Sequence, residues 1–384
     1  MRIALVSDCY LPQCGGIEVH VHDLALALRR AGHEVVVLTT TDGTGGTGGT
    51  GGTGGTGELS DVPVLRFRTA SDGHLARVLA PARFDVVHAH SSLVSPLAWS
   101  AVRLATAAGM PTVATMHSLP PPLPAPVGSL LHLALRLGPQ VRWTAVSEVA
   151  AAVLRPMVPA GRVDVLHNGI DPVPWRRAAR VRRSQPLTLV STGRLVRRKR
   201  PVALIRTLAE IRRQVPPEVP LRAVVIGDGP RRASVERTVR RLGMSSWVDL
   251  PGRLTRPEIQ RIYSQADVYL APARLESFGI AALEARCAGL PVVAMSSGGV
   301  GEFVRSGVEG FLADDDEALA SATVAMLTQP ALLRSMQAYN RATVPAMSWD
   351  IVIDQHLRAY ASAGAPSVFT LTGYSQPLSA VLPA

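Results

Sequence analysis

The sequence has few cysteines and no long apolar run. Only three of its 384 residues are cysteine, namely Cys9, Cys14 and Cys287, and neither their spacing nor nearby histidines suggest a metal site. We therefore expect no metal ligands and a reduced, cytoplasmic environment. No uninterrupted apolar segment is long enough to cross a bilayer, and the apolar core at the start is too short for a signal peptide.

Aromatic residues are also scarce, at 4%, and acidic residues are outnumbered. There are 40 lysines and arginines against 29 aspartates and glutamates, which gives a formal net charge of +11. Such a surface attracts nucleotides, anionic lipids or nucleic acid. Because no basic motif with interleaved aromatics is present, nucleic acid is not an expected partner. An arginine-rich composition inherited from a GC-rich genome would produce the same charge without a function.

Short apolar strands alternate with amphipathic helices along most of the chain. The strand Ile3–Ser7 leads through a Gly-Gly turn into a helix that ends near Arg30, and the strand Val35–Thr39 follows. This order predicts an α/β fold with parallel sheets and right-handed connections.

The length suggests two domains, and a basic, proline-containing stretch in the middle has no periodicity and is predicted to be the linker. The predicted segments are an amino-terminal domain (1–172) with a flexible Thr-Gly-Gly loop (43–57), a linker (173–186), a carboxy-terminal domain (187–345), a further helix (346–362) and a tail (363–384).

Two glutamates eight residues apart, Glu276 and Glu284, flank a predicted helix start. The helical spacing of the apolar residues places that start near Gly279. Gly279 allows the backbone to approach a ligand, and the free N–H groups of the first turn suit a diphosphate. Glu284, about two turns further on, suits the hydroxyls of a ribose. Two surface acids on a solvated helix are the alternative.

Polar residues end several predicted strands of the first half. Gly15 and Gly16 follow the first strand, whereas His90, His117 and Ser147 end later ones. Ligands of open α/β sheets lie at the carboxyl ends of the strands, so this pattern favours a cleft. A tight turn and ordinary structural histidines are the alternatives.

The second half contains two candidate phosphate loops. The first runs from Arg194 to Lys199 and is strongly cationic, as a diphosphate clamp requires, although a solvated charge run looks the same. The second, Gly227-Asp228-Gly229, matches the opening of a dinucleotide fingerprint, but Arg232 replaces its third glycine.

In this order, the motifs resemble those of the retaining glycosyltransferases of family GT4, which have the GT-B fold. The resemblance covers about residues 2–360. The residues that carry it are Gly15-Gly16-Ile17-Glu18-Val19-His20, His88-Ala89-His90-Ser91-Ser92, Thr115-Met116-His117-Ser118, His167-Asn168-Gly169-Ile170-Asp171, Gly193-Arg194-Leu195 with Lys199, Gly227-Asp228-Gly229-Pro230, Pro251-Gly252, and Glu276-Ser277-Phe278-Gly279 with Glu284. The resemblance implies two Rossmann-like, doubly wound domains facing a central cleft, with the helix 346–362 crossing back to the first domain.

The resemblance also implies roles for single residues. The implied catalytic residues are His117, Arg194, Lys199 and Glu276. The residues implied to bind the nucleotide-sugar donor, UDP- or GDP-linked, are Gly15, Gly16, Arg194, Lys199, Gly227, Asp228, Gly229, Glu276, Ser277, Phe278, Gly279, Ile280 and Glu284. The expected acceptor side comprises Glu18, His20, His90 and Ser118. The resemblance implies no metal and no separate cofactor.

The implied reaction is a front-face, retaining transfer of a hexose or N-acetylhexosamine to a hydroxyl of a lipid or a small molecule. The first-half motifs look like those of enzymes that glycosylate inositol phospholipids, and an apolar helix predicted at Leu130–Leu137 would suit peripheral contact with the anionic inner face of a membrane. One departure is Arg200, which stands where the family usually has glycine after the lysine. A nucleotide-sugar epimerase of the same architecture and a non-catalytic GT-B binding protein are the alternatives.

Overall fold

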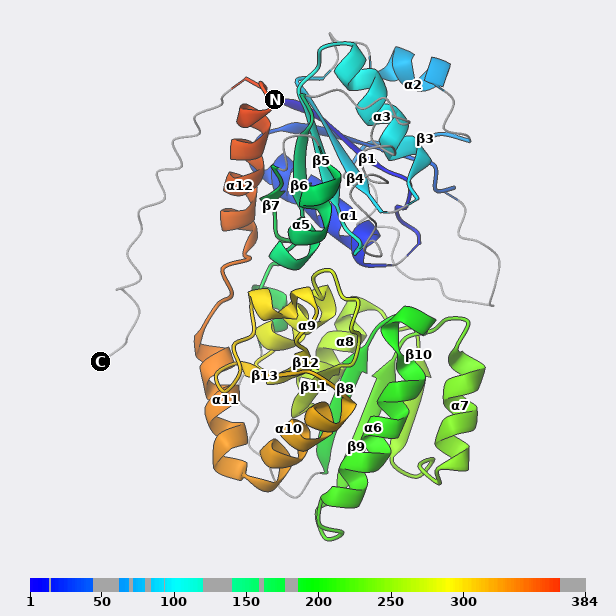
Figure 1. Ribbon diagram of the computed structural model, residues 1–384, viewed down its shortest axis with the longest axis vertical. Coiled ribbons are helices and arrows are strands. Elements are labelled where there is room, and N and C mark those ends of the chain that lie inside the picture. The colour runs from blue at the N-terminus through cyan, green and yellow to red at the C-terminus, as the bar shows by residue number, and fades with distance from the viewer. Residues whose placement is uncertain are drawn as a thin grey trace, which may run out of the picture.

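The computed structural model describes residues 1–13, 15–43, 62–68, 72–79, 84–92, 94–119, 140–158, 162–176 and 186–366. Cys14, nearly all of the Thr-Gly-Gly loop, the predicted helix Leu130–Leu137, most of the linker and most of the tail lie outside these residues. The described chain forms two α/β domains, one above the other in Figure 1.

Each domain is built on one parallel sheet. The first sheet has the order β3-β2-β1-β4-β5-β6-β7 and the second has the order β10-β9-β8-β11-β12-β13. The strands of the first sheet are β1 (Arg2–Ser7), β2 (Glu34–Thr39), β3 (Val64–Arg66), β4 (Val86–Ser91), β5 (Thr112–Met116), β6 (Arg142–Ala145) and β7 (Asp164–Val165). Those of the second are β8 (Leu187–Thr192), β9 (Leu221–Ile226), β10 (Val248–Gly252), β11 (Val268–Ala271), β12 (Val292–Met295) and β13 (Gly310–Ala313).

Helices cover both sheets. Those of the first domain are α1 (Gly16–Arg30), α2 (Asp72–Val78), α3 (Pro96–Ala107), α5 (Glu148–Leu154) and the 3-10 helix η1 (Arg155–Met157). Later elements are η3 (Val173–Trp175), η4 (Arg197–Lys199), α6 (Pro201–Gln214), α7 (Arg232–Arg241), α8 (Arg256–Tyr263), α9 (Ile280–Cys287), η5 (Gly299–Glu302), α10 (Asp316–Thr328), α11 (Pro330–Ala342) and α12 (Trp349–Ser362).

Both sheets reverse their strand order at one place, between β1 and β4 in the first sheet and between β8 and β11 in the second. Taken in chain order within each domain, both follow the doubly wound sequence 3-2-1-4-5-6, to which the first sheet adds β7, and this confirms the predicted fold class. Ligands of such sheets bind at the reversal, outside the carboxyl ends of the strands. The loops after β1, β4, β8 and β11 are therefore the positions for chemistry.

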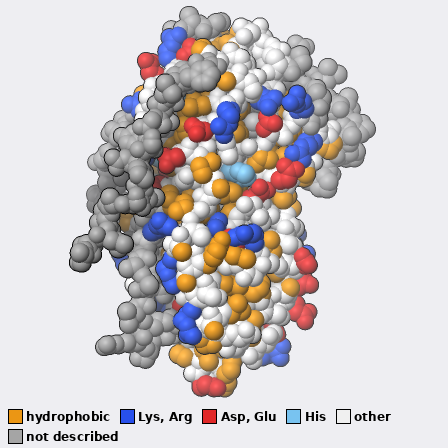
Figure 2. Space-filling model, turned by 90° about the vertical axis from the view of Figure 1, so that its left-hand side faces the viewer, with side chains coloured by type: hydrophobic (Ala, Val, Ile, Leu, Met, Phe, Trp, Pro, Cys, Tyr) orange, Lys and Arg blue, Asp and Glu red, His pale blue; other side chains and the backbone are white. Residues whose placement is uncertain are grey.

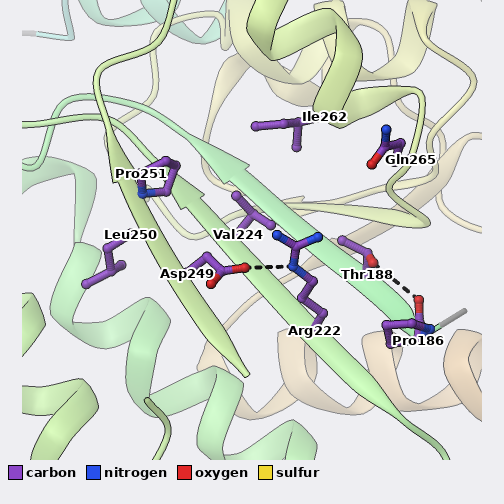
Figure 3. A pocket seen from close by; sticks show the side chains of 9 residues that line it. All are labelled: Pro186, Thr188, Arg222, Val224, Asp249, Leu250, Pro251, Ile262 and Gln265. Atoms are coloured by element: carbon purple, nitrogen blue, oxygen red, sulfur yellow. Dashed lines mark hydrogen bonds and ion pairs between the residues drawn. The ribbon is translucent and has the colours of Figure 1, made fainter. Parts of the chain in front are cut away.

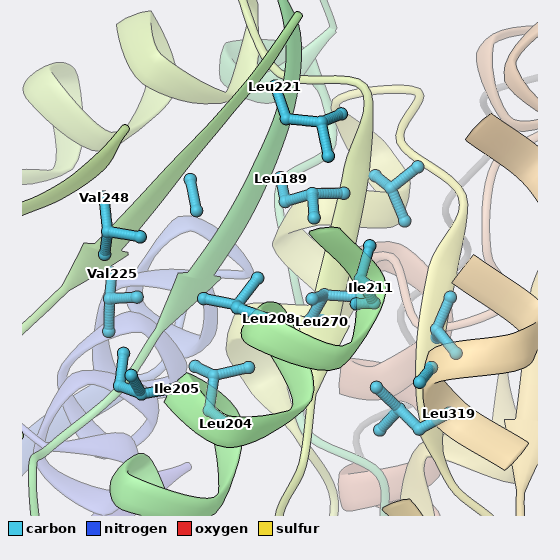
Figure 4. Close-up of a cluster of buried hydrophobic side chains, with 14 of the residues drawn as sticks. Leu189, Leu204, Ile205, Leu208, Ile211, Leu221, Val225, Val248, Leu270 and Leu319 are labelled. Atoms are coloured by element: carbon cyan, nitrogen blue, oxygen red, sulfur yellow. The ribbon is translucent and has the colours of Figure 1, made fainter. Parts of the chain in front are cut away.

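The core of the second domain explains why its loops are held firmly. Helix α6 places Leu204, Ile205, Leu208 and Ile211 on one face, with the spacing of an amphipathic helix (Figure 4). This face packs on apolar side chains of the strands, among them Leu189 of β8, and all of these residues are buried. The start of α6, which follows the cationic loop, is thereby fixed against the sheet.

Helix α12 leaves the second domain and packs on the first. It contacts α1 and β5, and its residues Ile353 and Tyr360 belong to the apolar core beneath α1 (Figure 1). The segment before it is tied to the first domain by hydrogen bonds between the backbones of Ile170 and Met347 (2.9 Å) and of Trp349 and Ile170 (3.2 Å). Two connections therefore join the domains, the linker and this helix.

The strand β7 is short, because only Asp164–Val165 forms a regular strand. Helix α3 begins at Pro96, because proline suits the first helical turn. The described start of the linker is ordered: Trp175 in η3 is buried and packs against Tyr263 of the second domain (ring centroids 5.7 Å).

Gly169 offers a test of the docking of α12. A β-carbon at this position would lie 2.4 Å from the ring of Trp349, so Gly169→Ala must displace the first turn of α12. We expect the free energy of unfolding to fall by about 1–3 kcal/mol in urea titrations. Gly73→Ala is the matched control, because no atom lies within 4 Å of its added β-carbon. Equal stability of the two variants would contradict this packing.

Candidate functional site

Lys199 and Glu276 form an ion pair at the carboxyl edge of the second sheet. Lys199 ends η4, just before α6, and Glu276 lies between β11 and α9. Their side chains are 27% and 16% exposed, so the pair remains open to a ligand. Lys199 is the only lysine of the sequence, and the other 39 of its 40 lysine and arginine residues are arginine. The structure thus joins two predicted catalytic residues that are 77 positions apart.

Two glycines hold the loop that carries Arg194. Gly227 has φ +132°, and a β-carbon there would lie 2.0 Å from the carbonyl oxygen of Gly193. Gly229 has φ +153° and approaches Leu195 in the same way, while the Leu195 N–H donates to the carbonyl of Asp228 (2.8 Å). Close contact between the two loops therefore explains why glycine stands at positions 227 and 229. A contact of Gly227, Asp228 or Gly229 with the donor stays a prediction.

The Arg194 side chain itself is exposed, and no hydrogen bond or ion pair joins it to another residue of the described ranges. Its charge nevertheless acts on Cys9 in the first domain, where it opposes the rise in the thiol pKa that burial and Glu18 cause. Arg194 therefore lies near the loop after β1 of the first domain. The structure does not bring Arg194 or the exposed Asp228 into the Lys199–Glu276 pair.

Arg200 takes the conformation that glycine usually takes. Its φ of 54° is in the left-handed region, where a side chain costs roughly 1–2 kcal/mol. The guanidinium donates to both carboxylate oxygens of Asp316 (2.8 and 2.7 Å) and to the carbonyl of Pro272 (3.0 Å). These contacts offset the backbone cost, so the departure at this position keeps the loop shape and does not place Arg200 at the ligand.

The helix α9 begins as the sequence predicts. Gly279 is its N-cap and has φ +93°, which glycine adopts without strain, and Ile280 is the first helical residue. Phe278 is buried against Phe303, with ring centroids 5.4 Å apart, so its side chain anchors the turn. The hydroxyl of Ser277 donates to the carbonyl oxygen of His117 across the domain boundary (2.6 Å).

Glu302 makes a second set of contacts between the domains. Its carboxylate accepts from the backbone N–H of Glu148 (2.7 Å) and pairs with the ring of His167 (2.9 Å). The hydrogen bond to His167 is the largest cause that lowers the Glu302 pKa. Together with the Ser277–His117 contact, these bonds fix how α9 and η5 sit against the first domain.

Glu284 is buried and faces an arginine that sequence reasoning missed. Its carboxylate lies 3.7 Å from Nε of Arg256, and the same guanidinium donates to both oxygens of Asp23 in α1 (3.1 and 2.5 Å). Burial raises the Glu284 pKa to about 7, although Arg256 opposes this rise. The pattern Thr255-x-x-Glu258 is a capping box that sets the start of α8 at Arg256. This pattern was the signal in the sequence from which the position of Arg256 at a helix start could have been predicted.

Five histidines gather at the carboxyl edge of the first sheet, under α12. His88 bonds to the hydroxyls of Tyr360 (2.9 Å) and Thr115 (2.7 Å), and His356 bonds to the carbonyl of Val352 (2.8 Å). The other three, the predicted site residues His20, His90 and His117, contact one another, and His90 Nδ1 lies 2.9 Å from His117 Nε2.

Burial keeps these histidines neutral. It lowers the pKa of His117 to about 3 and that of His356 to about 4, and it holds the pKa of the other three well below 6.5. His20 also stacks on the Trp349 ring (centroids 5.8 Å, interplanar angle 19°). A neutral imidazole can accept a hydrogen bond or bind a metal ion, but it cannot serve as a fixed positive charge.

The remaining first-domain predictions lie at the start of α1. Gly15 is the N-cap, and the Glu18 carboxylate lies so close that a β-carbon on Gly15 would stand 2.4 Å from its oxygen. Gly16 has open space around it. Ser118 is buried, and its hydroxyl contacts only the sulfur of Met116 (3.9 Å) among hydrogen-bond partners in the described segments. An anion at this helix start would meet the charge of Glu18.

The face of the molecule that Figure 2 shows has no continuous basic area. In Figure 2, lysine and arginine side chains are dispersed among acidic and apolar ones on the side that is shown. Among the residues that the structure describes, we find no helix of the length and apolarity that a bilayer crossing requires.

A cavity of about 450 Å³ lies away from these residues, in the second domain (Figure 3). Thr188 and Arg222 line it from the amino-terminal ends of β8 and β9, and Arg222 pairs with Asp249 (2.6 Å) on its wall. This end of the sheet is opposite to the carboxyl edge, and the cavity contains none of the predicted site residues. We assign it no chemistry.

Sequence profiles of two families match consecutive parts of the chain. The profile described as Glycosyltransferase Family 4 matches residues 14–173, and that described as Glycosyl transferases group 1 matches residues 176–343. The border between them falls at the end of η3, just inside the predicted linker.

Curated relatives are similar over most of the chain. One component of the human phosphatidylinositol N-acetylglucosaminyltransferase is 27% identical, over 78% of this chain and 63% of its own length. A glycogen synthase of Mycobacterium tuberculosis is 28% identical (94% and 95%), and D-inositol 3-phosphate glycosyltransferase 1 of Catenulispora acidiphila is 27% identical (94% and 96%). The chain therefore spans less than two thirds of the human relative and nearly all of the bacterial ones.

Solved structures support the same assignment at the level of the fold. HepE of Anabaena, solved in complex with UDP and glucose, superposes with a TM-score of 0.74 at 20% identity, over 94% of this chain and 100% of that one. A glycosyltransferase from Rickettsia africae has a TM-score of 0.75 at 18% identity (95% and 99%). With two matching family profiles on two doubly wound domains, the chain belongs to the group 1 glycosyltransferases of family GT4.

Proposed function

We propose that the protein transfers a hexose or N-acetylhexosamine, with retention, from a UDP- or GDP-linked donor to a hydroxyl of an inositol-type acceptor. The single observation that carries the proposal is the Lys199–Glu276 pair at the reversal of the second sheet. A fixed cation and a carboxylate, next to the open start of α9, are the groups that a sugar diphosphate requires.

In this proposal the chemistry depends on charge placed before the reaction. The bond between the sugar C1 and the phosphate oxygen breaks, and the leaving diphosphate gains negative charge. Arg194 and Lys199 stabilise that charge. The diphosphate replaces Glu276 as the partner of Lys199, and the Glu276 carboxylate then accepts hydrogen bonds from the sugar hydroxyls. The acceptor oxygen bonds to C1 on the same face, and its proton moves to the departing phosphate oxygen. Added Mg²⁺ should then not raise the turnover.

The choice of acceptor rests on the relatives. Two of them are named for transfer to phosphatidylinositol and to D-inositol 3-phosphate, and both align over three quarters of this chain or more. Free inositol phosphate and phosphatidylinositol vesicles are the two acceptors to compare. The anomeric configuration of the product, read by NMR, tests retention.

The single lysine makes donor binding directly measurable. An amine-reactive reagent can acylate only Lys199 and the amino terminus of the chain, so peptide mass spectrometry reports both rates in one sample. We expect UDP, GDP or one of their sugar conjugates to slow the acylation of Lys199, because the diphosphate covers its amine, and to raise the melting temperature. The rate at the amino terminus is the internal control. A folded protein that no nucleotide protects would contradict the proposal.

Arg194→Ala is expected to lower kcat about 100-fold or more, since removal of one charge-stabilising donor has an effect of this size. The exposed side chain makes few contacts, so the melting temperature should stay the same. Arg240→Ala, an exposed arginine on α7, is the matched control and should keep the activity. Near-normal turnover of Arg194→Ala would refute the assignment.

Replacement of Glu284 by glutamine is expected to raise the stability of the fold and to weaken nucleotide binding. The unfolded carboxyl ionises near pH 4.5 and the folded one near 7, so between these values only the unfolded state is charged. The destabilisation by Glu284 therefore grows as the pH rises from 4.5 to 7 and is constant above 7. Glu284→Gln should gain about 1–3 kcal/mol at pH 8 and little at pH 4.5, in urea titrations.

The same variant should weaken the nucleotide-induced rise in melting temperature, because a ribose loses its carboxylate partner. Glu236→Gln is the control, since Glu236 is a partly exposed partner of Arg232 on α7 and should show neither effect. A lower stability of Glu284→Gln than of the wild type at pH 8 would contradict the prediction that the buried carboxylate destabilises the fold.

A further inference from the structure

Three histidines from three elements share one buried place. His20 lies in α1, His90 in β4, and His117 directly after β5. Their exposed fractions are 1%, 1% and 6%, and one ring nitrogen of each lies within 4.8 Å of the others. Three nitrogens around one tetrahedral Zn²⁺ stand about 3.4 Å apart, given Zn–N bonds of about 2.0–2.1 Å. The nitrogens would have to approach one another by at most about 1.4 Å to reach that spacing.

Two nitrogens of this trio have no hydrogen-bond partner in the described part of the protein. They are Nδ1 of His20 and Nε2 of His90, and both are fully buried. An unsatisfied buried polar atom costs about 1–3 kcal/mol, so native structures usually supply a water, an ion or a protein group. The neighbours His88 and His356 do have partners. The unsatisfied nitrogens of the cluster therefore belong to the trio.

We propose that His20, His90 and His117 bind one divalent transition-metal ion, with Zn²⁺ as the best match, and leave a further coordination position open. Three imidazoles without a carboxylate suit Zn²⁺, Co²⁺, Ni²⁺ and Cu²⁺, whereas Mg²⁺ and Ca²⁺ prefer oxygen ligands. The low pKa values of these rings agree with the proposal, because the neutral form carries the free lone pair.

The ion would connect three elements of the first domain at the cleft. It would fix His117, whose carbonyl accepts the hydrogen bond from Ser277 of the second domain. The site is separate from Arg194 and Lys199, which belong to the second domain, so this inference goes beyond the proposed transfer and is tested without turnover.

Cobalt spectroscopy on the full chain tests the site. The protein is first stripped with a chelator and then titrated with Co²⁺. We expect visible absorption that saturates at one equivalent, disappears when Zn²⁺ is added and does not respond to Mg²⁺. His90→Gln and His117→Gln should each weaken Zn²⁺ binding at least tenfold. His22→Gln is the matched control, because His22 lies on the same helix but bonds to Tyr10 (2.8 Å) outside the trio.

The wild type provides a second measurement that does not depend on the folding of the variants. Long-range ¹H–¹⁵N NMR should show Zn²⁺-induced shifts of one ring nitrogen in three histidines. A folded wild type without cobalt absorption would overturn the proposal. Stoichiometric binding that both variants retain, or NMR shifts confined to other histidines, would overturn it as well.

Discussion

The hydrogen bond from Ser277 to the carbonyl of His117 joins the carboxyl edges of two parallel sheets. Parallel sheets place all their carboxyl ends on one side, so each domain has one edge where loops and chemistry gather. The two edges must face each other for a site to form between them. Glu302 supports this arrangement with its bonds to His167 and Glu148, and α12 makes the second connection.

Within this frame, the loops of the second domain hold their charges by contacts between backbones. Gly227 and Gly229 allow the Arg194 loop to lie directly on the next loop, and Arg200 closes the turn before α6 by pairing with Asp316. In a chain where arginine fills nearly every basic position, the single lysine stands opposite Glu276. The ammonium group of lysine is a compact point charge, whereas the guanidinium of arginine is planar and delocalised.

Local patterns in the sequence were sufficient for the fold class, for α1 and for the start of α9, because each depends on residues near in the chain. The resemblance implied roles for Lys199 and Glu276 but not their ion pair, since 77 residues separate them in the chain. The histidine cluster was not predicted, because His20, His90, His117 and His356 meet only after α1, β4, β5 and α12 have packed. The burial of Trp175 was missed because no periodic pattern surrounds it and because Tyr263, against which it packs, is distant in the chain.

The guanidinium of Arg256 touches carboxylates of both domains, Asp23 of the first and Glu284 of the second. Under the proposed function, a ribose bound to Glu284 would compete with Arg256 for this carboxylate, and Arg256 also donates to Asp23. The free energy of donor binding and the free energy of the contact between the domains at Asp23 would then be coupled. By thermodynamic linkage, whatever loosens the contact with Asp23 changes the affinity for the donor, and the donor changes the strength of that contact by the same factor.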